Sequence, residues 1–236
     1  MQPMSGDHAG LEADTARVSG RGRDRLVVVL AIGAGAADVT AFVVLGKVFS
    51  SVITGNLVLL GLAAASAKPG LALRSGLALA AYATGVLIGA PIAARGRRPT
   101  WPTGVTAALG VELCLLLGFT AGWEAARHRP GWQLVLLALL SAAMGVQSAA
   151  VAQLGHMSST YLTGTLTGVL AGLVTREHQA GRWRDAGAVA AVVAGAGAGE
   201  LLILFAPDWL PALTVLPLAT VIAVASRHRR PAADDS

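Results

Sequence analysis

FSSVITGNLVLLGL, residues 49–62, recurs 109 residues later as SSTYLTGTLTGVLA, residues 158–171. The two stretches align without a gap, so that Thr54-Gly55 falls on Thr163-Gly164. Similarity at a fixed spacing indicates a chain built from structural repeats. We therefore predict two internal repeats, one over about residues 26–122 and the other over about residues 135–226.

The composition predicts a protein that lies in a lipid bilayer. Hydrophobic residues make up 54% of the chain and charged residues only 13%, and the charges lie between apolar runs. Six runs are long enough to cross roughly 30 Å of hydrocarbon: residues 26–45, 71–94, 103–122, 133–154, 186–205 and 209–226. Two shorter runs, 52–67 and 160–175, are borderline. The predicted fold class is all-α, an integral membrane bundle of six to eight transmembrane helices.

The charge pattern predicts the membrane orientation and the tails. The formal charge of +5 comes from Lys and Arg side chains at the ends of the apolar runs, where they orient the protein and meet anionic head groups. The bilayer is thus the expected partner, and nucleic acid is not. We predict a single membrane domain over residues 26–226, a disordered basic tail over residues 1–25 and a C-terminal tail over residues 227–236. Both termini are expected in the cytoplasm of a cell with this protein in its plasma membrane.

The number of crossings decides how the repeats are related. Eight crossings would make the repeats parallel, whereas six crossings with two dipping segments would invert one repeat relative to the other. The positive-inside rule does not separate these models. Neither short run contains a proline or a charge that would turn it back, and this favours eight crossings, two of them short or broken.

Three acids lie within apolar runs: Asp38, Glu112 and Glu200. An ionised acid at the bilayer centre is costly, so each needs water, a proton or a polar partner. Asp38 is the strongest candidate for binding a substrate, proton or cation, and the alternative for it is a structural hydrogen bond between helices. Gln147, which falls on Asp38 in the repeat, keeps the hydrogen-bonding capacity without the charge.

The two repeated motifs supply a second set of candidate binding residues, Thr54, Gly55 and Asn56 in the first copy and Thr163, Gly164 and Thr165 in the second. Short helices that begin here would aim free N–H groups toward the membrane interior, as in transporters with broken helices. The alternative is that Thr and Asn cap the helices and Gly permits close packing. Ser50 or Ser51 is a further candidate cap for the first helix.

No motif for catalysis, a metal or a cofactor accompanies these residues. The sequence holds no HExxH and no P-loop, and Gly33 to Asp38 resembles half of a dinucleotide motif inside a spanning run. We predict that the protein is not an enzyme and binds no cofactor.

The two motifs also carry a resemblance. LGKVFSSVITGNLVLLG at 45–61, AMGVQSAAVAQLG at 143–155 and STYLTGTLT at 159–167, together with Asp38, resemble the YoaK family of uncharacterised bacterial transmembrane proteins, a domain-of-unknown-function family. The resemblance implies an integral protein of a bacterial membrane and brings no activity with it.

Three functions remain open. The favoured hypothesis is a permease or channel-like protein that moves a small solute or ion through a site between the repeats. The second is a membrane assembly protein that binds other components through small-residue faces such as Gly85-x-x-x-Gly89. The third, an enzyme acting on lipid, lacks a catalytic constellation. The sequence leaves the substrate and the oligomeric state open, a homo-oligomer included.

Overall fold

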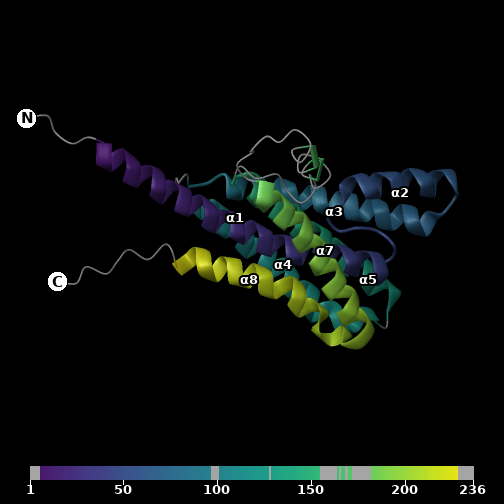
Figure 1. Cartoon of the computed structure of the whole chain (residues 1–236). Coiled ribbons are helices and arrows are strands. Elements are labelled where there is room, and N and C mark those ends of the chain that lie inside the picture. Colours follow the sequence, from purple (N-terminus) through teal and green to yellow (C-terminus); the bar gives the residue numbers. More distant parts are fainter. Residues whose placement is uncertain are drawn as a thin grey trace, which may run out of the picture.

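The computed structural model describes residues 6–96, 101–127, 129–154, 164, 166–167, 170–171 and 182–227, and this part of the chain is helical without a strand. This confirms the predicted all-α class. Figure 1 shows the elements α1 (Gly6–Val43), α2 (Ile53–Ala65), α3 (Pro69–Ala93), α4 (Thr103–Arg127), α5 (Pro130–Ala152), α7 (Arg182–Phe205) and α8 (Leu210–Arg227).

Six helical stretches have the length and hydropathy of membrane spans: Gly22–Val43, Pro69–Ala93, Thr103–Ala125, Gly131–Ala152, Ala186–Phe205 and Pro207–Arg227. Each coincides within a few residues with one of the six apolar runs. The 13 residues of α2 extend about 20 Å, less than the roughly 30 Å of a hydrocarbon core. The length of α2 therefore favours six crossings over the eight preferred from the sequence, while the second short run lies largely outside the described residues.

The first helix begins earlier than the sequence predicts. Residues 6–25, expected to be a disordered tail, form the first part of α1, which continues without a break to Val43. No proline interrupts residues 6–43, and helix formation propagates readily from an existing helical segment. The apolar span thus serves as the nucleus from which the helix extends toward the N-terminus.

The helices alternate in direction along the bundle. Both ends of the described chain lie at one end of the molecule; α1, α4 and α7 run away from that end, and α3, α5 and α8 run back toward it (Figure 1). The turn at 66–68 joins α2 and α3, which lie side by side at the opposite end. Consequently α1 and α5, the first helices of the two predicted repeats, run in opposite directions.

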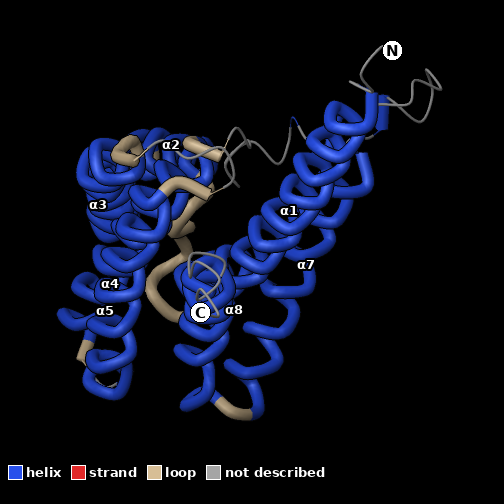
Figure 2. The backbone as a smooth tube through the Cα atoms, turned by 90° about the vertical axis from the view of Figure 1, so that its left-hand side faces the viewer, coloured by secondary structure: helices blue, strands red, loops and turns tan. Residues whose placement is uncertain are grey.

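The bundle has two arms (Figure 2). In one, α3, α4 and α5 pack together; in the other, α1 packs along α7, and α8 contacts both α1 and α4. The buried core is densest between α4 and α5, where fully buried side chains include Leu109, Leu116, Phe119, Leu136, Leu137 and Leu140. Each arm therefore combines helices from both halves of the sequence.

Glycines bring α3 and α5 into backbone contact. A Cβ atom on Gly85 would overlap the carbonyl oxygen of Ala142, and one on Gly145 would overlap the carbonyl oxygen of Tyr82. Gly89 lies against Val146 in the same way, with 3.0 Å from its would-be Cβ to the Val146 Cα. Only glycine permits this approach, so the predicted small-residue face of α3 is used inside the protein.

The α1–α7 pair repeats this arrangement. A Cβ atom on Gly195 would overlap the Ile32 carbonyl oxygen, one on Gly35 would overlap the Val192 carbonyl oxygen, and Gly199 lies 3.4 Å from the Ala36 Cα by the same measure. Adding 110 to the residue numbers 32, 35, 36, 82, 85 and 89 gives 142, 145, 146, 192, 195 and 199. The two close-packed pairs thus have the same contacts in a register of 110 residues, with the first and third helices exchanged between the halves.

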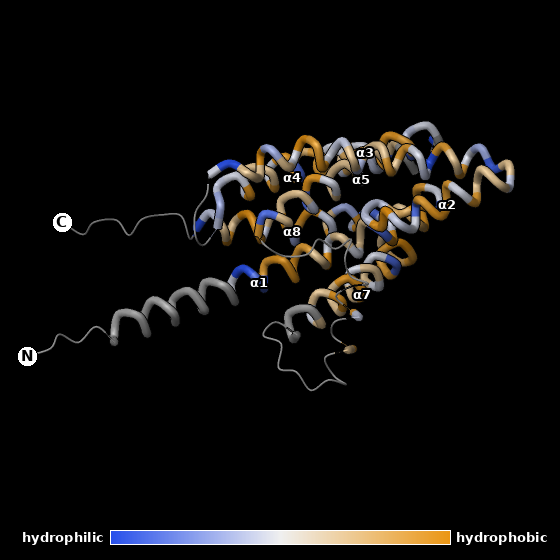
Figure 3. The backbone as a smooth tube through the Cα atoms, turned by 90° about the horizontal axis from the view of Figure 1, so that it is seen from above, coloured by the Kyte–Doolittle hydropathy of each residue, from blue (hydrophilic) through white to orange (hydrophobic). Residues whose placement is uncertain are grey.

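Large apolar side chains also cover the outside of the bundle. Apolar residues extend along the lengths of the helices rather than lying only on the faces that meet (Figure 3). Leu87 is 76% exposed, Val58 is 69% exposed and Phe205 is 80% exposed. Such a surface suits lipid rather than water.

Candidate functional site

The chain reverses sharply at the end of α1. The backbone at Gly46 has a φ of 130° and that at Lys47 a φ of 64°. At Gly46 this left-handed conformation favours glycine, and a Cβ there would also overlap the Arg74 side chain. Residues 48–51 then return along α1 and reach the level of Asp38, five residues before the end of that helix.

Asp38 holds the returning segment through four hydrogen bonds. Its Oδ1 accepts from the Ser50 N–H at 2.8 Å, the Ser50 hydroxyl at 2.9 Å and the Ser51 N–H at 2.8 Å. Its Oδ2 accepts from the Ser51 hydroxyl at 2.6 Å. A carboxylate accepts hydrogen bonds from several donors at once and makes short, charge-assisted ones. Asp38 therefore fixes the segment that leads into α2.

Asn56 holds the same segment from the other side. Its side-chain oxygen accepts from the Phe49 N–H at 2.9 Å, and its amide nitrogen donates to the Phe49 carbonyl at 2.6 Å. The amide thus pairs with both polar backbone groups of one residue, as a neighbouring strand would. Asn56 is fully buried, so these bonds also satisfy its own donor and acceptor.

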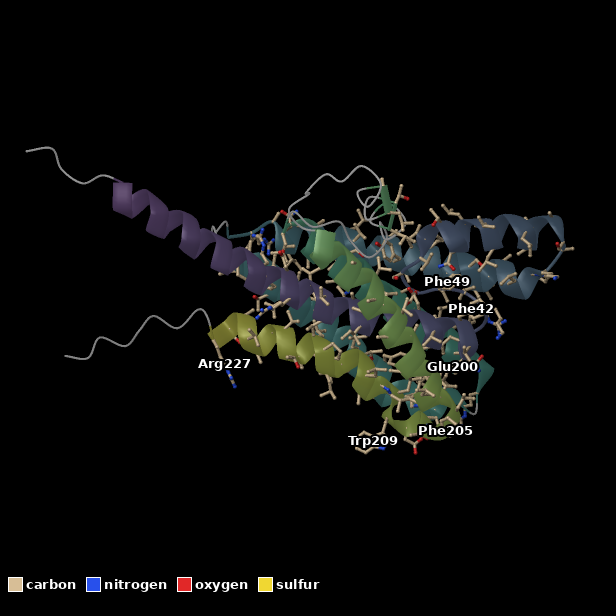
Figure 4. All side chains as sticks on the ribbon, viewed as in Figure 1. Phe42, Phe49, Glu200, Phe205, Trp209 and Arg227 are labelled. Atoms are coloured by element: carbon tan, nitrogen blue, oxygen red, sulfur yellow. The ribbon has the colours of Figure 1, made fainter. Side chains whose placement is uncertain are left out.

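Aromatic contacts complete the turn. The Phe42 and Phe49 rings stack with centroids 5.2 Å apart, and the Lys47 ammonium lies 5.1 Å from the Phe42 ring centroid. Figure 4 shows the two rings close together, where α1 ends and the chain returns toward α2. The Phe49 ring also supports Gly55, whose would-be Cβ lies 3.1 Å from it. Gly55 thus permits the approach of a side chain within the chain.

The start of α2 carries no side-chain cap. The predicted capping by Ser50 or Ser51 is wrong, because both hydroxyls donate to Asp38. Val52 occupies the N-cap position and makes no side-chain hydrogen bond to the helix. Within the described residues the N–H groups of Thr54 and Gly55 have no acceptor outside the helix. The start of α2 therefore points unpaired donors away from the helix, beside the segment that Asp38 holds.

The second set of candidates is described only in part. Thr163 and Thr165 lie outside the described residues, and Gly164 is an exposed helical residue. Gln147 is buried in α5. The 110-residue register of the glycine contacts pairs Asp38 with Ser148 instead of Gln147, because the packing of the helices is displaced by one residue from the 109-residue spacing of the motifs.

Glu112 and Glu200 lie away from the start of α2. Glu112 is fully buried on α4, and neither carboxyl oxygen has a hydrogen-bond partner among the described residues. Glu200 lies on α7, where one of its oxygens is buried without a partner in the same part of the chain. Of the three acids, only Asp38 is brought together with the repeated motif.

Arg74 was overlooked as a candidate. It lies on α3 within a predicted spanning run, and its side chain covers Gly46 at the turn between α1 and α2. Its Nε is buried without a hydrogen-bond partner among the described residues. A charged residue inside an apolar run was the signal that could have identified it. The hydroxyls of Ser75 and Ser141 are likewise buried without partners there, and nothing in the sequence distinguishes them from other serines.

The arrangement defines a class of protein, a polytopic helical membrane protein with a broken first helix. Within the part of the chain that the structure describes, no three His, Cys, Asp or Glu side chains are placed to hold a metal ion. The chain belongs to the family described as "Protein of unknown function (DUF1275)", whose model matches residues 26–225.

One relative has a name that agrees with this class. The chain is 36% identical over 150 residues to "UPF0700 transmembrane protein YoaK" of Bacillus subtilis (strain 168), which covers 63% of this chain and 66% of that protein. No solved structure matches the chain. The predicted resemblance to the YoaK family is confirmed, and so is the membrane class.

Proposed function

We propose that the protein is a permease for a small solute or ion, built from two inverted repeats with its site between them. The observation that carries this proposal is the shared 110-residue register of the α3–α5 and α1–α7 contacts. It relates two halves whose first helices run in opposite directions. Inverted repeats that exchange helices are a common basis for alternating access in secondary transporters.

The start of α2 is the proposed substrate side of this site. Asp38, Thr54, Gly55 and Asn56 meet there, and broken helices in transporters present such ends to ions and polar groups. In this conformation the Asp38 carboxylate is occupied by Ser50 and Ser51. Release of the segment 48–52 would free both the carboxylate and the serine donors, so the segment is a suitable two-state element.

The proposed location is the bacterial plasma membrane with both termini in the cytoplasm. With six crossings, thirteen of the 18 Lys and Arg residues lie on the side of the termini and five on the opposite side. Cytoplasmic loops carry the excess of such residues.

The assembly-protein alternative loses its main support. It requires small-residue faces that are free to bind a partner, but Gly85 and Gly89 already contact α5. Gly195 and Gly199 likewise contact α1. The faces that suggested an external partner are thus occupied within the chain, and this favours the permease.

Flux into liposomes tests the proposal. Purified protein would be reconstituted, and uptake of uncharged solutes followed by light scattering and that of protons by a trapped pH-sensitive dye. We expect flux above that of protein-free liposomes for at least one of these probes, lost in Asp38→Asn. Folded wild-type protein without flux of protons or of any tested solute would contradict the permease, and full flux in Asp38→Asn would remove Asp38 from its mechanism.

A further inference from the structure

Glu112 occupies a core position on α4. The buried residues of this helix follow one stripe: Val105, Ala108, Leu109, Glu112, Leu116, Phe119 and Trp123. Every other member of the stripe is apolar or aromatic and packs in the common core. Glu112 is fully buried at the centre of that stripe, where helix periodicity alone calls for a hydrophobic residue.

The helices around α4 bring no partner for this carboxyl. Helices α5, α8 and α3 pack against α4. Between Pro130 and Ala152, α5 holds no titratable residue, and the only one on α8 is Arg227 at its last position. Helix α3 carries Arg74 and Tyr82, and neither bonds to Glu112. Within the described residues the acid is therefore surrounded by neutral helix faces.

A structural role does not account for this acid. A buried polar group stabilises a fold only through its hydrogen bonds, and an apolar residue of similar volume in its place is often neutral or stabilising. Both Glu112 oxygens lack such bonds in the described part of the chain. A partnerless acid kept inside a membrane bundle points instead to a group that works by gaining and losing a proton.

We propose that Glu112 is a proton-binding site that couples the permease to a proton gradient. The carboxylate takes up one proton from the aqueous phase to become a neutral carboxylic acid, and releases that proton again when the core around α4 opens to water. Helix α4 contacts both α5 and α8, so it joins the two arms of the bundle. The proposal rests on the permease function, but proton binding itself can be measured without transport.

Infrared difference spectroscopy of the full-length protein in liposomes tests the site. The spectrum should contain the C=O stretch of a protonated carboxylic acid in apolar surroundings, and this band should change with pH. We expect the band to disappear in Glu112→Gln, which keeps the shape of the side chain. It should persist in the matched control Glu124→Gln, which changes an exposed acid on the same helix. Proton uptake by the same liposomes, driven by a potassium diffusion potential, should fall to the protein-free rate in Glu112→Gln.

Each outcome is decisive. A band that Glu112→Gln does not remove, or one that does not change over the pH range in which the protein stays folded, would overturn the proton site. A pH-dependent Glu112 band in wild-type protein that carries no proton flux would support proton binding and overturn its coupling to transport. Glu112→Leu serves as a second variant: it should fold and lose the band, and its failure to fold would show that the acid is structural and overturn the proposal.

Discussion

Ser51 binds Asp38 twice, through its backbone N–H at 2.8 Å from Oδ1 and through its hydroxyl at 2.6 Å from Oδ2. One residue of the returning segment thus engages both oxygens of an acid on the first span. Since residue 51 lies two positions before α2, the position of α2 depends on the side chain of α1. The acid that the sequence marks as functional is therefore also the residue that shapes the proposed site.

Asp38→Asn should loosen this connection. An amide has one acceptor oxygen and an NH₂ group that cannot accept, so at least one serine donor loses its partner. Hydrogen bonds to charged groups contribute about 1.5–3 kcal/mol each. We expect a lower midpoint of thermal unfolding and faster hydrogen exchange at the amides of Ser50 and Ser51. Unchanged exchange there would contradict the role of Asp38 in holding the segment.

Asn56→Asp should destabilise the turn more than its small change in shape suggests. The new carboxylate would accept from the Phe49 N–H but could not donate to the Phe49 carbonyl, which the Asn56 amide reaches at 2.6 Å. Leaving a buried acceptor unpaired costs about 1–3 kcal/mol. Comparison of thermal unfolding with that of Thr54→Val, which alters a neighbouring side chain without a hydrogen bond to this segment, measures the effect. Equal stability of the two variants would argue against the Asn56–Phe49 pair.

The glycine register predicts matched effects in the two halves. Gly85→Ala and Gly195→Ala place a methyl group on the carbonyl oxygens of Ala142 and Ile32, and overpacking of this kind costs about 1–3 kcal/mol. Gly76→Ala and Gly197→Ala lie on the same helices with nothing within 4 Å, so they should be neutral or stabilise by up to about 1 kcal/mol. Chemical unfolding of the four variants distinguishes the pairs. Similar effects at contact and control positions would refute the close packing.

Gly46→Ala should be destabilising for two separable reasons. A φ of 130° is strained for any residue with a Cβ, at a cost of about 1–2 kcal/mol, and the methyl group would also overlap Arg74. Shortening the neighbour in Gly46→Ala/Arg74→Ala removes only the overlap. The double variant should thus be less destabilised than the sum of the single variants. Strict additivity in unfolding measurements would exclude the contact between the two residues.

The sequence predicted the helices well and their pairing poorly. Apolar runs identify spans because membrane thickness sets their length, and the six long runs agree with the helices to within a few residues. The exchange of α3 and α7 between the halves was not predicted, because it depends on which glycine faces meet, and glycines are frequent along the whole chain. The one-residue displacement between motif spacing and helix packing could not be predicted for the same reason.

The candidate site was predicted in its members but not in its bonds. Asp38 and Asn56 were singled out from their positions in an apolar run and a repeated motif. That both grip residues 49–51 follows from the reversal at Gly46, which depends on tertiary contacts with Arg74 and Phe42. Sequence spacing alone assigned Ser50 and Ser51 to a helix cap, because a serine before a helix usually has that role.

The most direct test of the central claim, two inverted halves in six crossings, is the topology of two links. In a Cys114→Ala background without other cysteines, Arg129→Cys and Arg95→Cys would each be treated in intact cells with a membrane-impermeant thiol reagent, with lysed cells as the control for reactivity. The account predicts that the cysteine at position 129 is labelled from outside and that the one at position 95 is protected. The reverse pattern, with position 95 labelled and position 129 protected, would mean eight crossings and parallel repeats, and would contradict it.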